Sequence, residues 1–201
     1  MNLLCLRAVI LTVAFFLSLP PGVRADDTPT QVVEKLHGEL LQVMKDAEML
    51  GYQGRYEKLV KVIPAIYDFL FISRIVVGRY WRSFSEEEKK EFLDLFTRLS
   101  VATYANRFDG YSGESFSVIS ANESRRGRIV VETVLVQPSG EKIEMSYILH
   151  KKNNMWQIIN VIVEGVSDLS LKRADYAAFL KKKNTKALLD ELTAKISKLS
   201  D

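Results

Sequence analysis

Asp68 is the carboxylate in this sequence best suited to acid–base chemistry, because it interrupts the apolar run AIYDFLF. A carboxylate in an apolar pocket has a raised pKa and can act as a general base, as in ketosteroid isomerase. Aspartate is also among the best residues at the N-cap of a helix, and the pattern predicts a helix that begins at Phe69. We favour the cap, since the sequence identifies no partner that would stabilise an oxyanion.

Histidine and cysteine offer little further chemistry. His37 and His150 lie far apart in the sequence, and neither has the neighbour spacing of a metal ligand. We therefore predict that both are surface or strand-edge histidines. The single cysteine is Cys5, near the amino terminus. The sequence predicts no metal site and no cofactor.

Residues 1–25 have the order of a secretory signal peptide. Arg7 precedes a 12-residue apolar run, which is short for a membrane span of about 20 residues. The run ends at PPG, and the following VRA places small residues at the −3 and −1 positions of a cleavage site. We predict an exported chain whose mature form begins at Asp26.

The mature chain, residues 26–201, has the length of one domain and contains no cysteine. Its stability must therefore come from a hydrophobic core and not from disulfides. Without the two arginines of the leader, Lys+Arg falls from 28 to 26 against 25 Asp+Glu. Nucleic-acid binding usually demands a strongly basic surface, so we predict no nucleic-acid partner. We expect a monomer.

Apolar spacing predicts that the first half of the chain is helical. Ser85 and Glu88 have the spacing of a capping box at the start of the longest helix. The predicted helices are residues 29–50, ended by Gly51; two short helices, one up to about Tyr67 and one from Asp68 to Val77; and Glu86 to about Phe108.

The second half changes to β-rich runs separated by turn-forming residues. These runs are residues 115–120, 128–137, 141–152 and 155–165, and their short connections predict a curved four-stranded antiparallel sheet. Two further helices are expected at about 168–182 and 184–199. Helices, then a sheet, then helices indicate an α+β fold in one domain.

The 68–81 segment and the longest helix carry more apolar surface than packing on one sheet requires. Such an excess is often ordinary core, but it also suits an internal apolar cavity between these segments and the concave face of the sheet. Arg74, Arg79 and Arg82 are either candidates for meeting a phosphate near its mouth or ordinary surface charges. The predicted lining is Phe69, Ile72, Val76, Tyr80, Phe96, Tyr104, Met145, Tyr147, Ile159 and Val161.

Two stretches resemble a known family. VVGRYWRSFSEEEKKEFLDLFTRLSVATYANRFDGYSG (76–113) resembles the helical signature of the periplasmic phospholipid-binding proteins of the toluene-tolerance family. WQIINVIVEGVS (156–167) resembles that family's last strand and turn. The resemblance covers about residues 30–197. It implies a lipid shuttle that helps to maintain outer-membrane asymmetry, with an inner-membrane lipid transporter and an outer-membrane lipid complex as partners.

The sequence departs from the main family pattern after EGVS. Asp168, Leu169 and Ser170 precede LKRADYAAFL, and this version resembles the branch associated with hopanoid biosynthesis. The expected ligand is therefore phospholipid or hopanoid. We interpret the segment 164–180 as structural, with a turn at Gly165, a cap at Ser167 or Asp168, and a helix packed down by Leu169, Leu171, Tyr176 and Phe179.

The leading hypothesis is a periplasmic lipid-binding transfer protein that carries lipid between the inner and outer membranes and is not an enzyme. Two alternatives stay open. One is a small cavity enzyme of isomerase type with Asp68 as its base, and the other is a ligand-free periplasmic interaction module.

Overall fold

A computed structural model describes residues 27–200 of the 201-residue chain. The predicted signal peptide and its cleavage point before Asp26 lie outside the described residues. Within the part of the chain that is described, no helix combines the length and the apolar character needed to cross a membrane.

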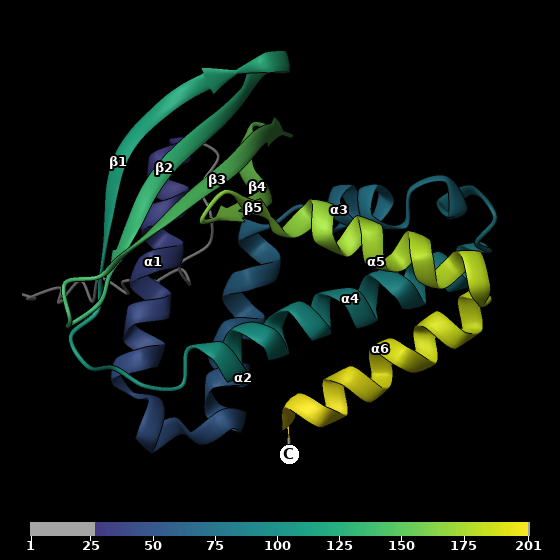
Figure 1. The fold of residues 1–201 in the computed structure, drawn as a ribbon, viewed down its shortest axis with the longest axis horizontal. Helices are drawn as coiled ribbons and strands as arrows, with labels where there is room; N and C mark the ends of the chain where they lie inside the picture. Colours follow the sequence, from purple (N-terminus) through teal and green to yellow (C-terminus); the bar gives the residue numbers. More distant parts are fainter. Residues whose placement is uncertain (1–26, 201) are drawn as a thin grey trace, which may run out of the picture.

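The described chain forms an α+β fold with six α-helices, two short 3-10 helices and one antiparallel sheet (Figure 1). The helices are α1 (Pro29–Lys45), α2 (Ala47–Ile66), α3 (Phe69–Val77), η1 (Gly78–Arg82), α4 (Glu86–Arg107), η2 (Arg125–Gly127), α5 (Asp168–Lys182) and α6 (Thr185–Ser200). The strands are β1 (Ser115–Ser124), β2 (Arg128–Val136), β3 (Lys142–Lys152), β4 (Met155–Val163) and β5 (Val166–Ser167).

The strands pair in chain order, from β1 to β5, and the sheet curves around the helix α1 (Figure 1). Helix α1 contacts β1, β2 and β4, while α4 packs against both α2 and α6, and α3 packs against α5. Helices α3 to α6 extend away from the sheet as a helical layer (Figure 1). The α+β architecture predicted from the sequence is therefore confirmed.

Most helix boundaries lie within one residue of the prediction, and the exception is the junction between α1 and α2. The capping box of Ser85 and Glu88 is present at the start of α4. The first predicted helix was expected to end at Gly51, but α1 ends at Lys45 and α2 already begins at Ala47. Gly51, with φ of 56°, is instead a kink inside α2, a conformation that glycine adopts without steric cost. Apolar periodicity continues through the bend and hides it.

The sheet has five strands, and the prediction of four was wrong. Strand β5 folds back on β4 through a two-residue turn, Glu164 with φ of 49° and Gly165 with φ of 76°. Positive φ at both central residues is the pattern of a type I′ turn, whose twist matches that of a hairpin. The sequence suggested an exit from the sheet at Gly165 because the returning strand has only two residues.

Strand β4 contains one extra residue, Ile159. Ile148 pairs with Asn160 while its neighbour Leu149 pairs with Ile158, so Ile159 has no residue of its own opposite it on β3. Such a bulge interrupts the alternation of inward and outward side chains. Val161 therefore faces the helical layer, whereas Ile159 lies on the other side of the sheet beside Ile148.

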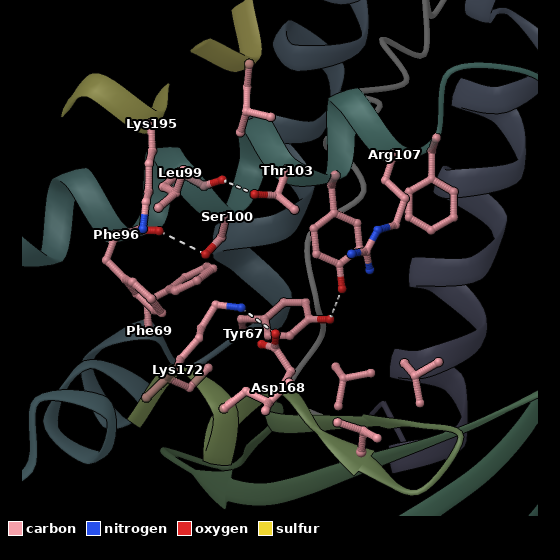
Figure 2. A pocket seen from close by; sticks show the side chains of 18 of the residues that line it. Tyr67, Phe69, Phe96, Leu99, Ser100, Thr103, Arg107, Asp168, Lys172 and Lys195 are labelled. Atoms are coloured by element: carbon pink, nitrogen blue, oxygen red, sulfur yellow. Dashed lines mark hydrogen bonds and ion pairs between the residues drawn. The ribbon is translucent and has the colours of Figure 1, made fainter. Parts of the chain in front are cut away.

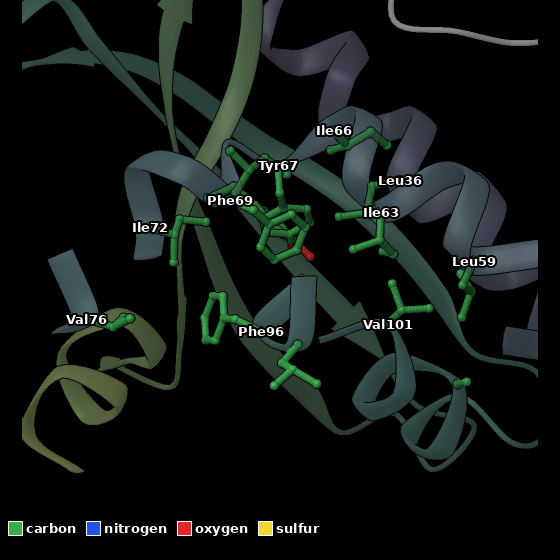
Figure 3. Packing of buried hydrophobic residues seen from close by; sticks show 14 of the residues in the cluster. Leu36, Leu59, Ile63, Ile66, Tyr67, Phe69, Ile72, Val76, Phe96 and Val101 are labelled. Carbon is green, nitrogen blue, oxygen red and sulfur yellow. The ribbon is translucent and has the colours of Figure 1, made fainter. Parts of the chain in front are cut away.

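The core is continuous from α1 and α2 to α4 (Figure 3). Leu36, Leu59 and Ile63 are fully buried, as is Val76 farther along α3. Near α5 the core becomes aromatic, because Phe92 stacks on Phe96 and Tyr176 makes a T-shaped contact with each of the two rings. These contacts hold α4 and α5 together within the helical layer.

His37 is buried, and the prediction of a surface histidine was wrong. Its side chain is 4% exposed, its Nε2 is hydrogen-bonded to the Tyr147 hydroxyl at 3.0 Å, and its ring stacks on Phe116. Burial lowers the pKa of His37 from 6.5 to about 4, so the ring is neutral at pH 7. The sequence could not show this, because the partner Tyr147 lies on a strand 110 residues away.

Asp68 caps α3, as predicted, and also joins this helix to the sheet. Its carboxylate accepts from the Phe71 N–H at 3.0 Å, from Lys152 Nζ at 2.9 Å and interacts with His150 Nε2 at 3.1 Å. Burial acts to raise the pKa of Asp68, but the hydrogen bonds from Lys152 and Phe71 outweigh it and the pKa is lowered. His150 lies near the end of β3, as expected, but with a specific partner.

We expect Asp68→Asn to lower the free energy of unfolding by about 1 kcal/mol, because asparagine keeps the cap but loses the ion pair with a half-exposed Lys152. Asp68→Ala should cost about 1 kcal/mol more, since it removes the cap as well. Urea unfolding at pH 7 measures both. In a Lys152→Met background, the cost of Asp68→Asn should shrink. An unchanged cost there would show that the ion pair contributes nothing.

The buried His37 should make the protein less stable as the pH falls from 6.5 towards 4. In this window the unfolded chain binds a proton at His37 that the folded chain excludes, and the total effect is about 2–3 kcal/mol. Denaturant unfolding at pH 7, 5.5 and 4.5 measures the decline. It should be shallower in His37→Gln than in the wild type, and parallel declines in the two chains would refute the assignment.

Candidate functional site

A pocket of about 700 Å³ opens between α4, the carboxyl-terminal end of α6 and the inner face of β3 and β4 (Figure 2). Its floor is formed by buried and partly buried aromatic and aliphatic side chains from the α2–α3 junction, α3, α4 and the sheet. They are Tyr67, Phe69, Ile72, Phe96, Phe108, Met145, Tyr147, Val161 and Val163.

Seven of the ten residues predicted to line a cavity lie in this pocket: Phe69, Ile72, Phe96, Tyr104, Met145, Tyr147 and Val161. They come from α3, α4, β3 and β4, the segments between which the cavity was expected. The pocket opens to solvent at its rim, so the enclosed cavity stays a prediction, as does the role of these residues in binding lipid.

The other three predicted residues lie elsewhere. Val76 is one turn beyond Ile72, where α3 has passed the pocket and is buried in the core (Figure 3). Tyr80 lies in η1 and packs against the same core. Ile159 lines a smaller pocket of about 150 Å³ across the sheet, because the bulge in β4 turns it away from Val161.

The rim combines exposed apolar side chains with charges. Val166 is 52% exposed and Leu171 54% exposed, and both line the pocket. Leu171 was expected to pack α5 down, but the residues that are buried in α5 are Tyr176 and Leu180. The segment after EGVS is therefore more than structural, since it forms part of the rim. The charged rim residues are Arg107, Asp168, Lys172, Lys195 and Lys198.

The three arginines predicted to meet a phosphate are not at this rim. Arg74, Arg79 and Arg82 are exposed, but the pocket lining includes none of them. The Arg79 guanidinium instead donates to the Tyr80 hydroxyl at 3.1 Å. Proximity in sequence to the pocket-forming helix α3 was misleading here, because the chain turns away at Gly78.

Two rim cations are available to bind an anion. Lys172 pairs with Asp168, and Lys195 lies 3.5 Å from Glu191. Arg107 and Lys198, by contrast, have no carboxylate partner within residues 27–200. Sequence reasoning missed both, although Lys198 adjoins the apolar stripe of the last helix and Arg107 ends the longest one. The missing information was that the ends of α4 and α6 lie side by side.

Most hydroxyl groups in the pocket are engaged within the protein. Ser100 donates to the Phe96 carbonyl at 2.8 Å, and Thr103 donates to the Leu99 carbonyl at 2.7 Å (Figure 2). A further hydrogen bond joins the hydroxyls of Tyr67 and Tyr104. Burial raises the pKa of Tyr104 to about 12, so this phenol stays protonated at neutral pH.

The arrangement suits binding better than the acid–base chemistry considered for Asp68. That carboxylate is not part of the pocket lining, and its pKa is lowered, which is the reverse of what a general base in an apolar site needs. Three or more side chains able to hold a metal ion do not come together anywhere in the described range. The pocket offers an apolar floor for apolar groups and a basic rim for an anionic one.

Comparison with known proteins identifies similar chains. The chain is 27% identical over 158 residues to the toluene tolerance protein Ttg2D of Pseudomonas putida, an alignment that covers 76% of this chain and 73% of that protein. It is 23% identical over 121 residues to the intermembrane phospholipid transport system binding protein MlaC of Haemophilus influenzae, with 58% and 56% covered.

A solved structure has the same fold. The phospholipid-binding protein from Ralstonia solanacearum, determined in complex with a phospholipid, superposes with a TM-score of 0.72 at 19% identity and covers 85% of this chain and 97% of its own. The model of the family described as MlaC protein matches residues 34–194, most of the described chain. This chain therefore belongs to the MlaC protein family.

Proposed function

We propose that this protein is a periplasmic lipid carrier that holds a phospholipid or a hopanoid in the pocket between α4, α6 and the sheet. The observation that carries the proposal is the pocket itself, with its aromatic floor and basic rim. Its volume of about 700 Å³ lies within the range of roughly 300–1,000 Å³ found for ligand pockets. The names of the Haemophilus and Ralstonia relatives support phospholipid as the ligand.

Such a carrier must bury the apolar part of the lipid, but it needs few specific polar contacts with it. Each methylene removed from water contributes about 0.8 kcal/mol, so a free acyl chain is strongly excluded from the aqueous space. A bilayer offers the same burial, which brings the net free energy of extraction close to zero. A pocket with an apolar floor and few polar contacts therefore permits both loading and release.

The route of transport is part of the proposal. A carrier between the inner and outer membranes would receive lipid from an inner-membrane transporter and exchange it with an outer-membrane complex. Export by the signal peptide of residues 1–25 would place it there, and N-terminal sequencing of the exported chain tests this step. Hopanoid stays a candidate ligand because Asp168 and Leu171, from the segment that departs from the main family pattern, lie at the rim.

An interaction module that uses the exposed Val166 and Leu171 for a partner protein is the second candidate. The two functions differ in what the purified protein contains. A carrier should release lipid on organic extraction and lose a corresponding mass in native mass spectrometry. An interaction module should contain none.

Met145→Trp should abolish lipid co-purification and leave a folded protein. Met145 lines the pocket from β3, so the larger indole occupies the space of the ligand and not space already filled by core atoms. Native mass spectrometry and extraction measure the bound lipid, and circular dichroism measures folding. A variant that is folded and still loaded with wild-type amounts of lipid would contradict the proposed location.

Two tryptophan variants serve as controls for this substitution. Ile119→Trp adds bulk to a side chain that is 65% exposed on β1, so lipid should be retained. Val76→Trp forces the same ring into a fully buried core position, and overpacking there should cost about 1–3 kcal/mol of stability. The carrier proposal requires Met145→Trp to lose lipid, unlike Ile119→Trp, and to keep its stability, unlike Val76→Trp.

The rim cations should contribute to the affinity for anionic lipid. We expect Arg107→Gln and Lys198→Gln each to weaken binding of phosphatidylglycerol by about twofold to fivefold, as for exposed ion pairs of about 0.5–1 kcal/mol. The loss should diminish at high salt. Arg79→Gln and Arg82→Gln are matched controls outside the pocket. Equal effects of all four would assign the attraction to net charge and not to the rim.

A further inference from the structure

The hydroxyl groups of the pocket can be counted as donors and acceptors. Ser100 and Thr103 give their protons to carbonyls of their own helix. The Tyr147 hydroxyl is held by His37. Ser100 and Thr103 thus have no proton left for a ligand, and the Tyr147 hydroxyl lies 3.0 Å from His37 Nε2. The Tyr67–Tyr104 pair is different.

A pair of phenols has two O–H protons but only one hydrogen bond between the two oxygens. Whichever of Tyr67 and Tyr104 donates to the other, the acceptor keeps a proton of its own. Within the described chain, neither hydroxyl has a second hydrogen-bonded partner. The pair therefore presents one unused donor to the pocket that both residues line.

Burial keeps this donor protonated. Burial is the main cause that raises the pKa of both phenols, and the Asp168 carboxylate raises it further without a hydrogen bond to either of them. Asp168 is itself paired with Lys172. A protonated phenol beside an apolar floor leaves an unmet donor, which is costly to bury without an acceptor.

The position of the pair also fits a particular part of a lipid. Tyr104 is three residues before Arg107 on α4, a spacing that places both on the same helix face. Arg107 is at the exposed rim, while Tyr67 and the adjacent Phe69 are buried (Figure 2). The pair thus lies between the charged rim and the apolar floor. If a lipid places its charged head group at the rim, the junction between head group and apolar body lies beside the pair.

We propose that the Tyr67–Tyr104 pair is a subsite that donates a hydrogen bond to an oxygen of the carried lipid. This inference rests on the carrier function proposed above and adds a criterion for selecting the ligand. The oxygen is either an ester carbonyl of a phospholipid or a hydroxyl of a hopanoid, which share the chemistry of an acceptor attached to a large apolar body. A ligand without it leaves the phenol proton unsatisfied on binding.

Matched lipid pairs test the proposal on delipidated protein by displacement of a fluorescent phospholipid. One pair is dipalmitoyl phosphatidylglycerol and its ether-linked dihexadecyl analogue, which lacks the carbonyls. The other is a pentacyclic triterpene alcohol and the hydrocarbon of the same skeleton. The wild type should prefer the oxygen-bearing member of at least one pair by about tenfold, and the pair that discriminates identifies the source of the oxygen.

Substitutions then assign the preference to the phenols. Tyr67→Phe and Tyr104→Phe each leave one hydroxyl that can still donate, so each should retain most of the preference. The double variant should lose it, while its affinity for the ether lipid or hydrocarbon stays near that of the wild type. Tyr176→Phe, a buried tyrosine outside the pocket lining, is the matched control.

The failures are distinguishable. If the wild type binds lipids but prefers neither oxygen-bearing member, the subsite is refuted and the carrier stands. The subsite is refuted in the same way if the double variant keeps the preference. If no lipid of either pair binds, the carrier function itself fails. Should the double variant not fold and the ester pair be the one that discriminates, the infrared band of an isotope-labelled ester carbonyl bound to the wild type decides. A carbonyl frequency equal to that in an apolar solvent means that no donor meets the carbonyl and refutes the subsite.

Discussion

The attachment of α3 to the sheet at Asp68 is the constraint on which the pocket depends. The Asp68 N–H donates to the Ile158 carbonyl at 3.1 Å, and Tyr67 forms a parallel bridge with the same residue of β4. The carboxylate begins α3 and is held from the other side by Lys152. Together these bonds fix where α2 stops and in which direction α3 leaves.

This junction determines which side chains face the ligand space. Tyr67 precedes Asp68 and Phe69 follows it, and both form part of the pocket floor. The buried Asp68 carboxylate has its hydrogen bonds satisfied within the protein, so the junction is a rigid support. The side of Tyr67 and Phe69 that faces the pocket is not covered by other parts of the described chain. A protein that keeps about 700 Å³ open gives up packing contacts there. The continuous core along α1, α2 and α4 compensates for that loss.

Local sequence signals predicted most of the fold, and the errors occur where a distant residue decides. The capping box at Ser85 and the cap at Asp68 depend on residues within one turn, and both were identified correctly. His37 was misassigned because its burial depends on Tyr147. Ile159 was misplaced because alternation of period two does not reveal a bulge, which appears only when both strands are paired.

The buried floor of the pocket was more predictable than its rim. Phe96 and Tyr104 belong to an unusually wide apolar face of one helix, which is visible in the sequence. Lys195 and Leu199 join the same pocket only because α6 returns alongside α4, and no local pattern reports that return. The sequence pattern also does not distinguish an exposed apolar side chain such as Leu171 from one that packs in the core. Its place at the rim becomes visible only once the position of the pocket is known.

Because β4 contains one extra residue, its geometry depends more strictly on the number of residues in the strand than on which apolar residues they are. Asn160, displaced by the bulge, accepts hydrogen bonds from the Leu169 N–H and the Ser167 hydroxyl and so anchors the start of α5. Removing one residue would restore plain alternation, and either Ile158 would leave the core or Val161 would leave the pocket. Exchanges among β-branched side chains preserve this geometry. In this strand, natural variation should therefore take the form of substitutions, with insertions and deletions confined to the adjoining turns.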